Sequence, residues 1–445
     1  MALTRLRLEN FKCYANSGAI PLAPLTVIFG GNNTGKSSIL QSLLLLRQTL
    51  DSPEYAARLN LRGTLYPAGS YADIVHQHRT KEHVIIELGI VTSDGGKAGD
   101  IQLEFSSDEP QPPRLARLRI EASSVEPLEI HRGVGRGGPY ELVIGGATIG
   151  GEKRANFRFP VNQLLPAIGE EELPRVGRPN IRHQRSRAFA RQVLRELEGT
   201  LRQMKAVGAF RHQPVRRYEY LGRSPDVVDA VGEYMVNALI EDATRRGKRR
   251  GELLRSVNRW LNAVGRVRLM PLKRISRAAR IFEIRLRDTD SGRWANFADV
   301  GFGIGQAFPV LVEGLRTPPG GLFIVQEPEI HLHPDAQLRM ADFLVSLARA
   351  GKRVIAETHS EYLLLRIRRS IIGPVKARGT RPRLAPREVS IIHVEKRSDG
   401  TSHAHPLEID ELGQIKKWPR GFMEEATEER MAIMEEMAKR AGTRS

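Results

Sequence analysis

The sequence predicts an α/β fold with a mixed sheet, a β-rich lobe and an inserted helical lobe. Near the N-terminus, the apolar run at residues 25–29 leads into a glycine-rich turn, and a helical pattern follows at 37–50. From residue 321 the chain alternates strand, helix, strand and helix, the order of a parallel sheet with crossover helices. Between these parts, residues 83–159 contain alternating apolar and polar runs separated by Pro-, Gly- and Ser-rich turns, which favour β-strands.

A phosphate-binding loop is predicted at residues 30–37, which read GGNNTGKS and match G-x-x-x-x-G-K-[ST] between a strand and a helix. Glycines let the backbone turn tightly, so that its N–H groups and the helix N-terminus surround phosphate oxygens, while Lys36 adds positive charge. Ser37 places a hydroxyl where Mg²⁺ can bind. The segment therefore predicts binding of a nucleoside triphosphate. The expected contacts are Gly30, Gly31, Asn32, Asn33, Thr34, Gly35, Lys36, Ser37 and Ser38.

The chain of 445 residues is too long for one simple core, and its patterns divide it into five segments. We expect residues 1–82 to form the N-terminal part of a nucleotide-binding head, 83–160 the β-rich lobe, 161–292 a basic helical insertion, 293–385 the C-terminal part of the head, and 386–445 a C-terminal module with a charged helix. The head is thus expected to combine both ends of the chain.

The positive charge is concentrated in the middle of the chain. The formal net charge is +18, and the stretch from Arg175 to Asp290 holds 28 Lys and Arg against 12 Asp and Glu. A concentration of positive charge of this kind usually binds a nucleic-acid backbone or another polyanion. A solvated, arginine-rich surface is the alternative interpretation.

Several classes of protein are excluded by composition. No apolar run approaches the roughly 20 residues of a membrane span, and the opening residues lack the order of segments found in a signal peptide. Cys13 is the only cysteine, so an internal disulfide is impossible. We expect a cytoplasmic protein that does not contact a membrane.

Five stretches of the chain, one of which contains the phosphate loop, show a family resemblance. The opening LRLENFKCYANSGAIPLAPLTVIFGGNNTGKSSILQSLLLLRQ resembles the RecF/SMC/OLD (overcoming lysogenization defect) branch of ABC-type ATPases. DVGFGIGQAFPVLVEGL is similar to its signature, IVQEPEIHLHP to its Walker B strand and D-loop, and AETHS to its histidine switch. The end of the chain resembles an uncharacterised C-terminal module of some bacterial OLD-like ATPases. The resemblance implies an ABC-type P-loop ATPase head with ATP and Mg²⁺ as cofactors.

Heads of this family work as head-to-tail pairs, in which each ATP lies between the phosphate loop of one subunit and the signature of the other. The resemblance therefore implies a homodimer or higher homo-oligomer, with Gly303, Gly305 and Gln306 contacting the partner's nucleotide. A plain loop before the following helix is the alternative for this glycine-rich segment.

The predicted Walker B strand ends in Gln326, where the family commonly has an acid. Gln326 offers a carbonyl oxygen without negative charge. The resemblance places Glu327 as the general base and His359 as the sensor of the γ-phosphate, with Ser37, Gln326 and Glu327 around Mg²⁺. Glu329 is a weaker substitute for the base. ATP hydrolysis is predicted, at a low rate.

Other polar residues have more than one interpretation. Arg211, Arg216 and Arg217 could bind nucleic acid or a partner, or could hold the fold through ion pairs. The histidines of HQH (76–78) and HLHP (331–334) have spacing compatible with zinc, but the second pair fits the D-loop better.

The resemblance points to a nucleotide-driven switch in bacterial anti-phage defence. The sequence after His359 lacks the acidic cluster of a Toprim nuclease, so a nuclease effector would be a separate protein. A sensor module with little hydrolysis, a DNA-repair ATPase and a transporter ATPase subunit are the alternative functions.

Overall fold

The structure is a computed structural model. It describes residues 2–52, 57–93, 98–132, 140–148, 181–220, 234–247, 249–276, 280–373 and 384–419, with isolated positions at 96, 164–165, 222, 231–232, 429, 431–435 and 437.

In the described residues, the first sheet has nine antiparallel strands in the order β10-β9-β8-β7-β6-β5-β1-β2, with β3 paired to β1. In β1, Leu6 and Leu8 are fully buried while Arg5 and Arg7 face outward, the alternation of a sheet with one covered face. The strands are β1 (Ala2–Phe11), β2 (Tyr14–Asn16), β3 (Ile20–Pro21), β5 (Val84–Val91), β6 (Ala98–Asp108), β7 (Gln111–Ala122), β8 (Val125–Arg132), β9 (Tyr140–Ile144) and β10 (Ala147–Thr148).

The second sheet is mixed, as expected. Its order is β11-β18-β19-β4-β20-β21, and all neighbours are parallel except β20 and β21. Both ends of the chain contribute strands, and residues far apart in sequence therefore meet at its carboxyl edge. The strands are β4 (Leu25–Gly30), β11 (Lys205–Val207), β18 (Leu322–Gln326), β19 (Arg353–Thr358), β20 (Val389–Lys396) and β21 (Ser402–Leu407).

The remaining elements cover the two sheets or form small additions. The helices are α1 (Lys36–Leu50), α2 (Tyr71–Ile74), α3 (Ile181–Arg202), α4 (Met235–Thr244), α5 (Glu252–Gly265), α6 (Phe302–Arg316), α7 (Pro334–Arg349) and α8 (Glu361–Ile372), with short 3-10 turns η1 (His76–His78), η2 (Phe297–Asp299) and η3 (Pro386–Glu388). One three-stranded sheet consists of β12 (Tyr218–Glu219), β15 (Ile281–Glu283) and β14 (Lys273–Ser276). A second consists of β13 (Val267–Leu269), β16 (Arg285–Asp288) and β17 (Trp294–Asn296).

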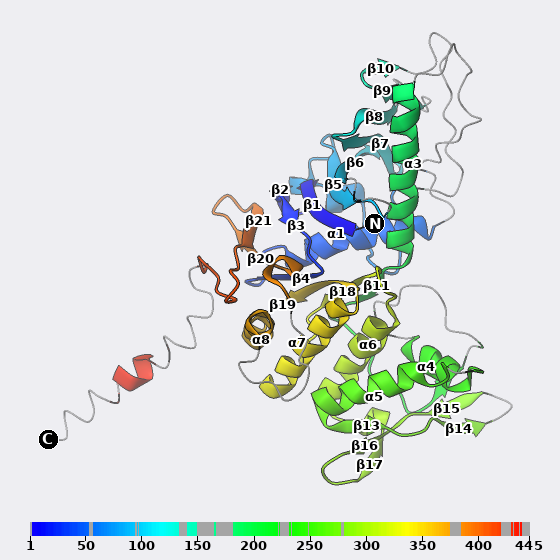
Figure 1. The fold of residues 1–445 in the computed structure, drawn as a ribbon, viewed down its shortest axis with the longest axis vertical. Helices are drawn as coiled ribbons and strands as arrows, with labels where there is room; N and C mark the ends of the chain where they lie inside the picture. The colour runs from blue at the N-terminus through cyan, green and yellow to red at the C-terminus, as the bar shows by residue number, and fades with distance from the viewer. Residues whose placement is uncertain are drawn as a thin grey trace.

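The second sheet separates two hydrophobic cores. Ile28 of β4 packs with α1, α3 and the first sheet, whereas Val27 and Phe29 pack with α4 to α8. In Figure 1 these two groups of elements lie on opposite sides of the second sheet. Alternate residues of one strand thus belong to different cores. Helix α1 lies between the layers, and Leu45 is as buried as its neighbours Leu43 and Leu46. Helix α1 is therefore buried on more than one side.

The predicted lobes are less separate than the sequence patterns indicate. Strand β5 pairs directly with β1, so the β-rich segment extends the sheet that the N-terminus begins. Within segment 161–292, α3 packs against β8 and α1, and β11 forms the edge of the second sheet. The charged helix expected at 423–440 lies largely outside the described residues. No described helix combines the length and apolar character needed to cross a membrane.

Candidate nucleotide-binding site

The predicted phosphate loop connects β4 to α1, and its glycines are required by close packing. A Cβ on Gly30 would lie 2.2 Å from the carbonyl oxygen of Val394, and one on Gly35 would lie 2.3 Å from Sγ of Cys13. Both glycines also have positive φ, 150° and 101°, which other residues rarely adopt. The loop thus turns sharply and delivers the chain into the N-terminus of α1, where N–H groups are available for phosphate.

Lys36 folds back onto the loop. Its Nζ donates hydrogen bonds to the carbonyl oxygens of Gly30 and Gly31 at 3.1 and 2.6 Å. Burial lowers the pKa of Lys36, while the charges of Glu357 and Glu327 act in the opposite direction. The ammonium is therefore held over the loop with two carboxylates in electrostatic range.

The carboxyl ends of three parallel strands meet beside this loop. Gln326 of β18 is in register with Glu357 of β19, and Glu357 is in register with Ile28 of β4. Glu357 is buried, its Oε1 accepts a 2.6 Å hydrogen bond from Oγ of Ser37, and its Oε2 accepts one of 2.8 Å from Nε2 of Gln326. The expected site residues Ser37 and Gln326 are thus joined through a third residue.

Glu357 was missed by the sequence analysis. It lies in AETHS, two positions before His359, and the interpretation of that stretch concentrated on the histidine. The register of parallel strands is the signal that could have identified it, because an acid at the end of β19 must lie beside the end of β18.

Glu327 directly follows β18 in an unusual conformation. Its φ is +44°, in the left-handed region, and its N–H donates a 2.8 Å hydrogen bond to the carbonyl of Glu357. Its side chain is half-buried and acts electrostatically on both Lys36 and His359. The structure therefore brings the expected base, the loop lysine and the expected sensor histidine to one place.

Glu329 shapes the segment that carries His359. Its buried Oε1 accepts hydrogen bonds from Oγ1 of Thr358 and from the N–H groups of His359 (2.9 Å) and Ser360 (3.0 Å). Burial raises the pKa of Glu329. The Glu329 carboxylate thus holds the turn before α8 and thereby positions His359. It does not face the phosphate loop itself. The imidazole of His359 is exposed, and partial burial followed by the charge of Lys36 lowers its pKa.

Arg211 lies inside the protein, in contrast to the surface contact considered from the sequence. Its guanidinium donates to the main-chain carbonyls of Gly208 (2.8 Å), Gln306 (3.0 Å), Gln326 and Glu327 (2.9 Å). Burial lowers the pKa of Arg211 to about 10. The residue therefore ties together the end of β11, helix α6 and the end of β18.

The two neighbouring arginines are at the surface. Arg216 forms a two-pronged ion pair with Asp299 at 2.9 and 2.6 Å, and Arg217 is exposed. Asp299 lies in η2, just before α6. Arg216 is thus placed just before the signature-like helix.

The signature-like residues pack mainly against their own chain. A Cβ on Gly303 would lie 2.5 Å from the carbonyl oxygen of His331, and one on Gly305 would lie 2.9 Å from Pro214. Gln306 is buried, and its carbonyl is held by Arg211. The exposed part of this helix start is Gly301 and Phe302, and the Phe302 ring meets that of His331 edge-on at 4.6 Å.

The histidine pairs have ordinary structural contacts. Nδ1 of His333 accepts from the N–H of Asp335 and caps α7, while Nδ1 of His76 and His78 contact the carbonyls of Lys12 and Ala72, both at 2.7 Å. Across the described part of the chain, no three His, Cys, Asp or Glu residues form a group that could hold a metal ion.

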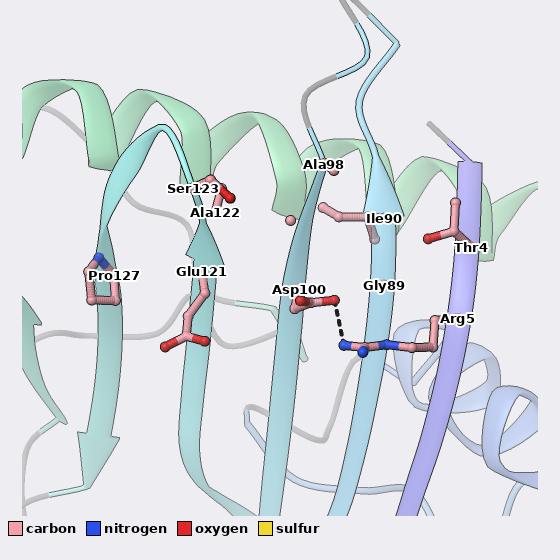
Figure 2. Close-up of a pocket in the computed structure, with 11 residues that line it drawn as sticks. Thr4, Arg5, Gly89, Ile90, Ala98, Asp100, Glu121, Ala122, Ser123 and Pro127 are labelled. Atoms are coloured by element: carbon pink, nitrogen blue, oxygen red, sulfur yellow. Dashed lines mark hydrogen bonds and ion pairs between the residues drawn. The ribbon is translucent and has the colours of Figure 1, made fainter. Parts of the chain in front are cut away.

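A hollow of about 660 Å³ on the first sheet is a separate feature (Figure 2). Arg5, Asp100 and Glu121 line it, and Nη2 of Arg5 donates to Oδ1 of Asp100 at 2.8 Å. No residue of the phosphate loop lines it, so the nucleotide site lies elsewhere.

The fold and this site define a P-loop nucleotide-binding protein of the mixed α/β class. Residues 1–109 match a family model described as "AAA ATPase domain", and residues 166–366 one described as "AAA domain, putative AbiEii toxin, Type IV TA system". Residues 384–433 match a protein family of unknown function. The chain therefore carries AAA-type ATPase domains over residues 1–109 and 166–366.

Solved structures with a similar arrangement are SMC heads. One is the SMC head bound to the C-terminal winged-helix domain of ScpA, with 13% identity, a TM-score of 0.44, and coverage of 92% of this chain and 98% of that one. The SMC head domain of Thermotoga maritima has 13% sequence identity and a TM-score of 0.40, and the match covers 92% of this chain and 100% of that one. An SMC head with an extended coiled coil, bound to the C-terminal domain of ScpA derived from Pyrococcus furiosus, has 13% identity and a TM-score of 0.42, and the match covers 98% of this chain and 99% of that one. The search of curated proteins found no match.

Proposed function

We propose that this protein is an ABC-type ATPase of the OLD/RecF kind that binds ATP, hydrolyses it slowly and thereby switches between monomer and dimer. The observation that carries the proposal is the convergence of Lys36, Glu327 and His359 beside one glycine-lined loop. These groups follow the carboxyl ends of strands β4, β18 and β19, which share one sheet edge.

The residues have separable roles. The N–H groups of the loop and of α1 surround phosphate oxygens, and Lys36 leaves the carbonyls of Gly30 and Gly31 to meet them. Glu327 orients the attacking water and accepts its proton. His359 faces the γ-phosphate, where a neutral imidazole can donate from one ring nitrogen and accept at the other. Burial first and the charge of Lys36 second lower the pKa of His359.

Magnesium, when bound with ATP, neutralises phosphate charge. The surrounding oxygen donors fit this ion, because Mg²⁺ binds through hydroxyl, carboxylate and phosphate oxygens. In this chain Ser37 is next to the buried Glu357 carboxylate, and Gln326 adds an amide without charge. Because the end of β18 carries the uncharged Gln326 in place of an acid, slow ATP turnover is expected.

The dimer is proposed to form across the start of α6. Gly301 and Phe302 are exposed there, and Phe210, beside the buried Arg211, is 91% exposed. Aromatic side chains of this exposure are typical of contact surfaces. In the dimer, the N–H groups at the start of α6 would face the partner's nucleotide, with Gly303, Gly305 and Gln306 behind them as its structural support.

The switch is proposed to act on nucleic acid or on a separate effector such as a Toprim-type nuclease, in bacterial anti-phage defence. Arg216 pairs with Asp299 just before α6, and the exposed Arg217 follows it in the chain, so a polyanion bound by this pair would lie near the surface that ATP is proposed to reorganise. The name of the family matched by residues 166–366 refers to a toxin–antitoxin system, and such systems consist of two components.

One experiment tests the core of the proposal. Sedimentation and phosphate release are measured with ATP and Mg²⁺ for the wild-type protein, Lys36→Ala and Glu327→Gln. We expect ATP-dependent dimers and slow release for the wild type, neither for Lys36→Ala, and persistent dimers without release for Glu327→Gln. Unchanged release by Glu327→Gln would remove this residue as the base.

A sensor module with little hydrolysis is the second candidate, and the uncharged Gln326 favours it. The same measurement separates the two, because the sensor forms ATP-dependent dimers without releasing phosphate above the level of Lys36→Ala. Stimulation of turnover by DNA that disappears in Arg216→Glu with Arg217→Glu would identify nucleic acid as the trigger.

A further inference from the structure

We propose that Glu357 supplies the carboxylate of the magnesium site, in place of the acid that is missing at Gln326. The proposal rests on the proposed binding of ATP at the phosphate loop. It moves the acidic residue from the end of β18 to the end of the neighbouring strand β19, a position that the sequence analysis had not assigned to any role.

A hydrogen bond from Ser37 to Glu357 supports this assignment. The Oγ of Ser37 lies 2.6 Å from Oε1 of Glu357. A serine hydroxyl has one hydrogen and two lone pairs, and an ionised carboxylate can only accept. The hydrogen of Ser37 therefore points at Glu357, and the lone pairs are left for a cation on the phosphate side. Glu357 thus orients the hydroxyl and brings negative charge next to it.

Gln326 also supports the assignment, because it acts as a donor to Glu357. Its amide lies 2.8 Å from Oε2 of Glu357, and because the carboxylate only accepts, the amide must present its NH₂ group. Gln326 therefore fixes the second oxygen of Glu357 by donation. A glutamate at 326 would instead place two carboxylates in contact, and the repulsion would favour protonation of one of them. The glutamine and the relocated acid thus form a matched pair.

The burial of Glu357 and its proximity to Lys36 also support the assignment. Glu357 is only 3% exposed, and its charge acts on Lys36 more strongly than that of Glu327. A buried carboxylate needs compensation, and two hydrogen bonds provide part of it. A divalent cation on the phosphate side of Ser37 would provide the rest. Glu327, which is half-buried and forms no comparable bond to Ser37, stays available for the attacking water.

The test is the effect of the divalent ion on nucleotide affinity, which is independent of turnover. ATP binding is measured by calorimetry in EDTA and in Mg²⁺, and Mn²⁺ binding to the ADP complex by electron paramagnetic resonance. The variants are Glu357→Gln, the exchange Gln326→Glu with Glu357→Gln, and Glu411→Gln as an exposed charge-matched control.

For Glu357→Gln we expect the gain in affinity due to Mg²⁺ to fall by about 10- to 100-fold, as for loss of a group that orients a metal ligand. Its affinity in EDTA should stay equal or become tighter, because a carboxylate that repels phosphate is gone. The exchange variant restores one acid and should recover most of the gain, while Glu411→Gln should match the wild type.

An undiminished Mg²⁺ gain and normal Mn²⁺ binding in Glu357→Gln would overturn the proposal. Equal loss in the single and exchange variants would also overturn it, since the defect would then not follow the number of acids. Failure of ATP binding itself is distinguishable: the wild type in EDTA would then bind no better than Lys36→Ala.

Discussion

The guanidinium of Arg211 donates a 2.9 Å hydrogen bond to the main-chain carbonyl of Glu327. The same guanidinium reaches the carbonyl of Gln306 in α6 at 3.0 Å. The expected base and the signature-like helix are therefore connected through one buried side chain. Because Glu327 has a positive φ, its backbone depends on such fixed partners.

The first prediction concerns the stability that Arg211 supplies. Arg211→Met fills much of the space but leaves buried carbonyls without a donor, so we expect a loss of about 2–4 kcal/mol in the free energy of unfolding. Urea denaturation followed by circular dichroism measures it. Arg217→Met, at an exposed position, is the control and should change stability by less than about 0.5 kcal/mol. Equal effects would mean that the carbonyl contacts contribute little.

The second prediction concerns the glycines at the start of α6. Gly303→Ala places a methyl group 2.5 Å from the carbonyl of His331, and we expect a cost of about 1–3 kcal/mol from this overpacking. Gly301→Ala is the matched control, because nothing lies within 4 Å of its Cβ. Thermal unfolding of the two variants compares them directly. A tolerated Gly303→Ala would show that the helix and the D-loop segment can separate without loss.

The third prediction is the titration of His359. Its pKa is lowered by burial first and by Lys36 second, so an NMR titration should give a midpoint below the usual value of about 6.5. In Lys36→Ala the midpoint should move upward, because one of the two causes is removed. A midpoint at or above the usual value in the wild type would contradict the placement of His359 beside the lysine.

The fourth prediction is a pH effect from Glu329, whose pKa is raised by burial. A carboxyl with a raised folded pKa binds more protons in the folded state, so stability decreases as pH rises from about 4.5 through the folded pKa. Glu329→Gln keeps an acceptor for Ser360 and His359 and removes this dependence. Urea midpoints from pH 4 to 8 should fall more steeply for the wild type than for Glu329→Gln, and parallel curves would contradict the burial of this charge.

Local motifs were predicted well, because their geometry is contained in consecutive residues. The run from Leu25 to Ser38 specifies a strand, a tight glycine turn and a helix start, and the structure has these elements at those positions. The parallel part of the second sheet was also predictable, since strands and helices alternate in the C-terminal part. In segment 161–292, α3 packs against β8 and α1 while β11 forms the edge of the second sheet, and such contacts between distant elements are not contained in a local pattern.

The electrostatic roles depended on non-local neighbours. Arg211 was grouped with Arg216 and Arg217 because all three are basic and close in sequence. Only the structure separates them, since β11 carries the chain into the sheet edge and leaves Arg211 among carbonyls. Glu357 was overlooked because its partners Ser37 and Gln326 are 320 and 31 residues away.

By itself, the sequence determined that a triphosphate-binding loop exists, since backbone shape and charge there follow from neighbouring residues. The tertiary structure alone decided which acid stands beside Ser37. That choice depends on how β18 and β19 align across the sheet, and hydrogen bonds between distant strands set this alignment.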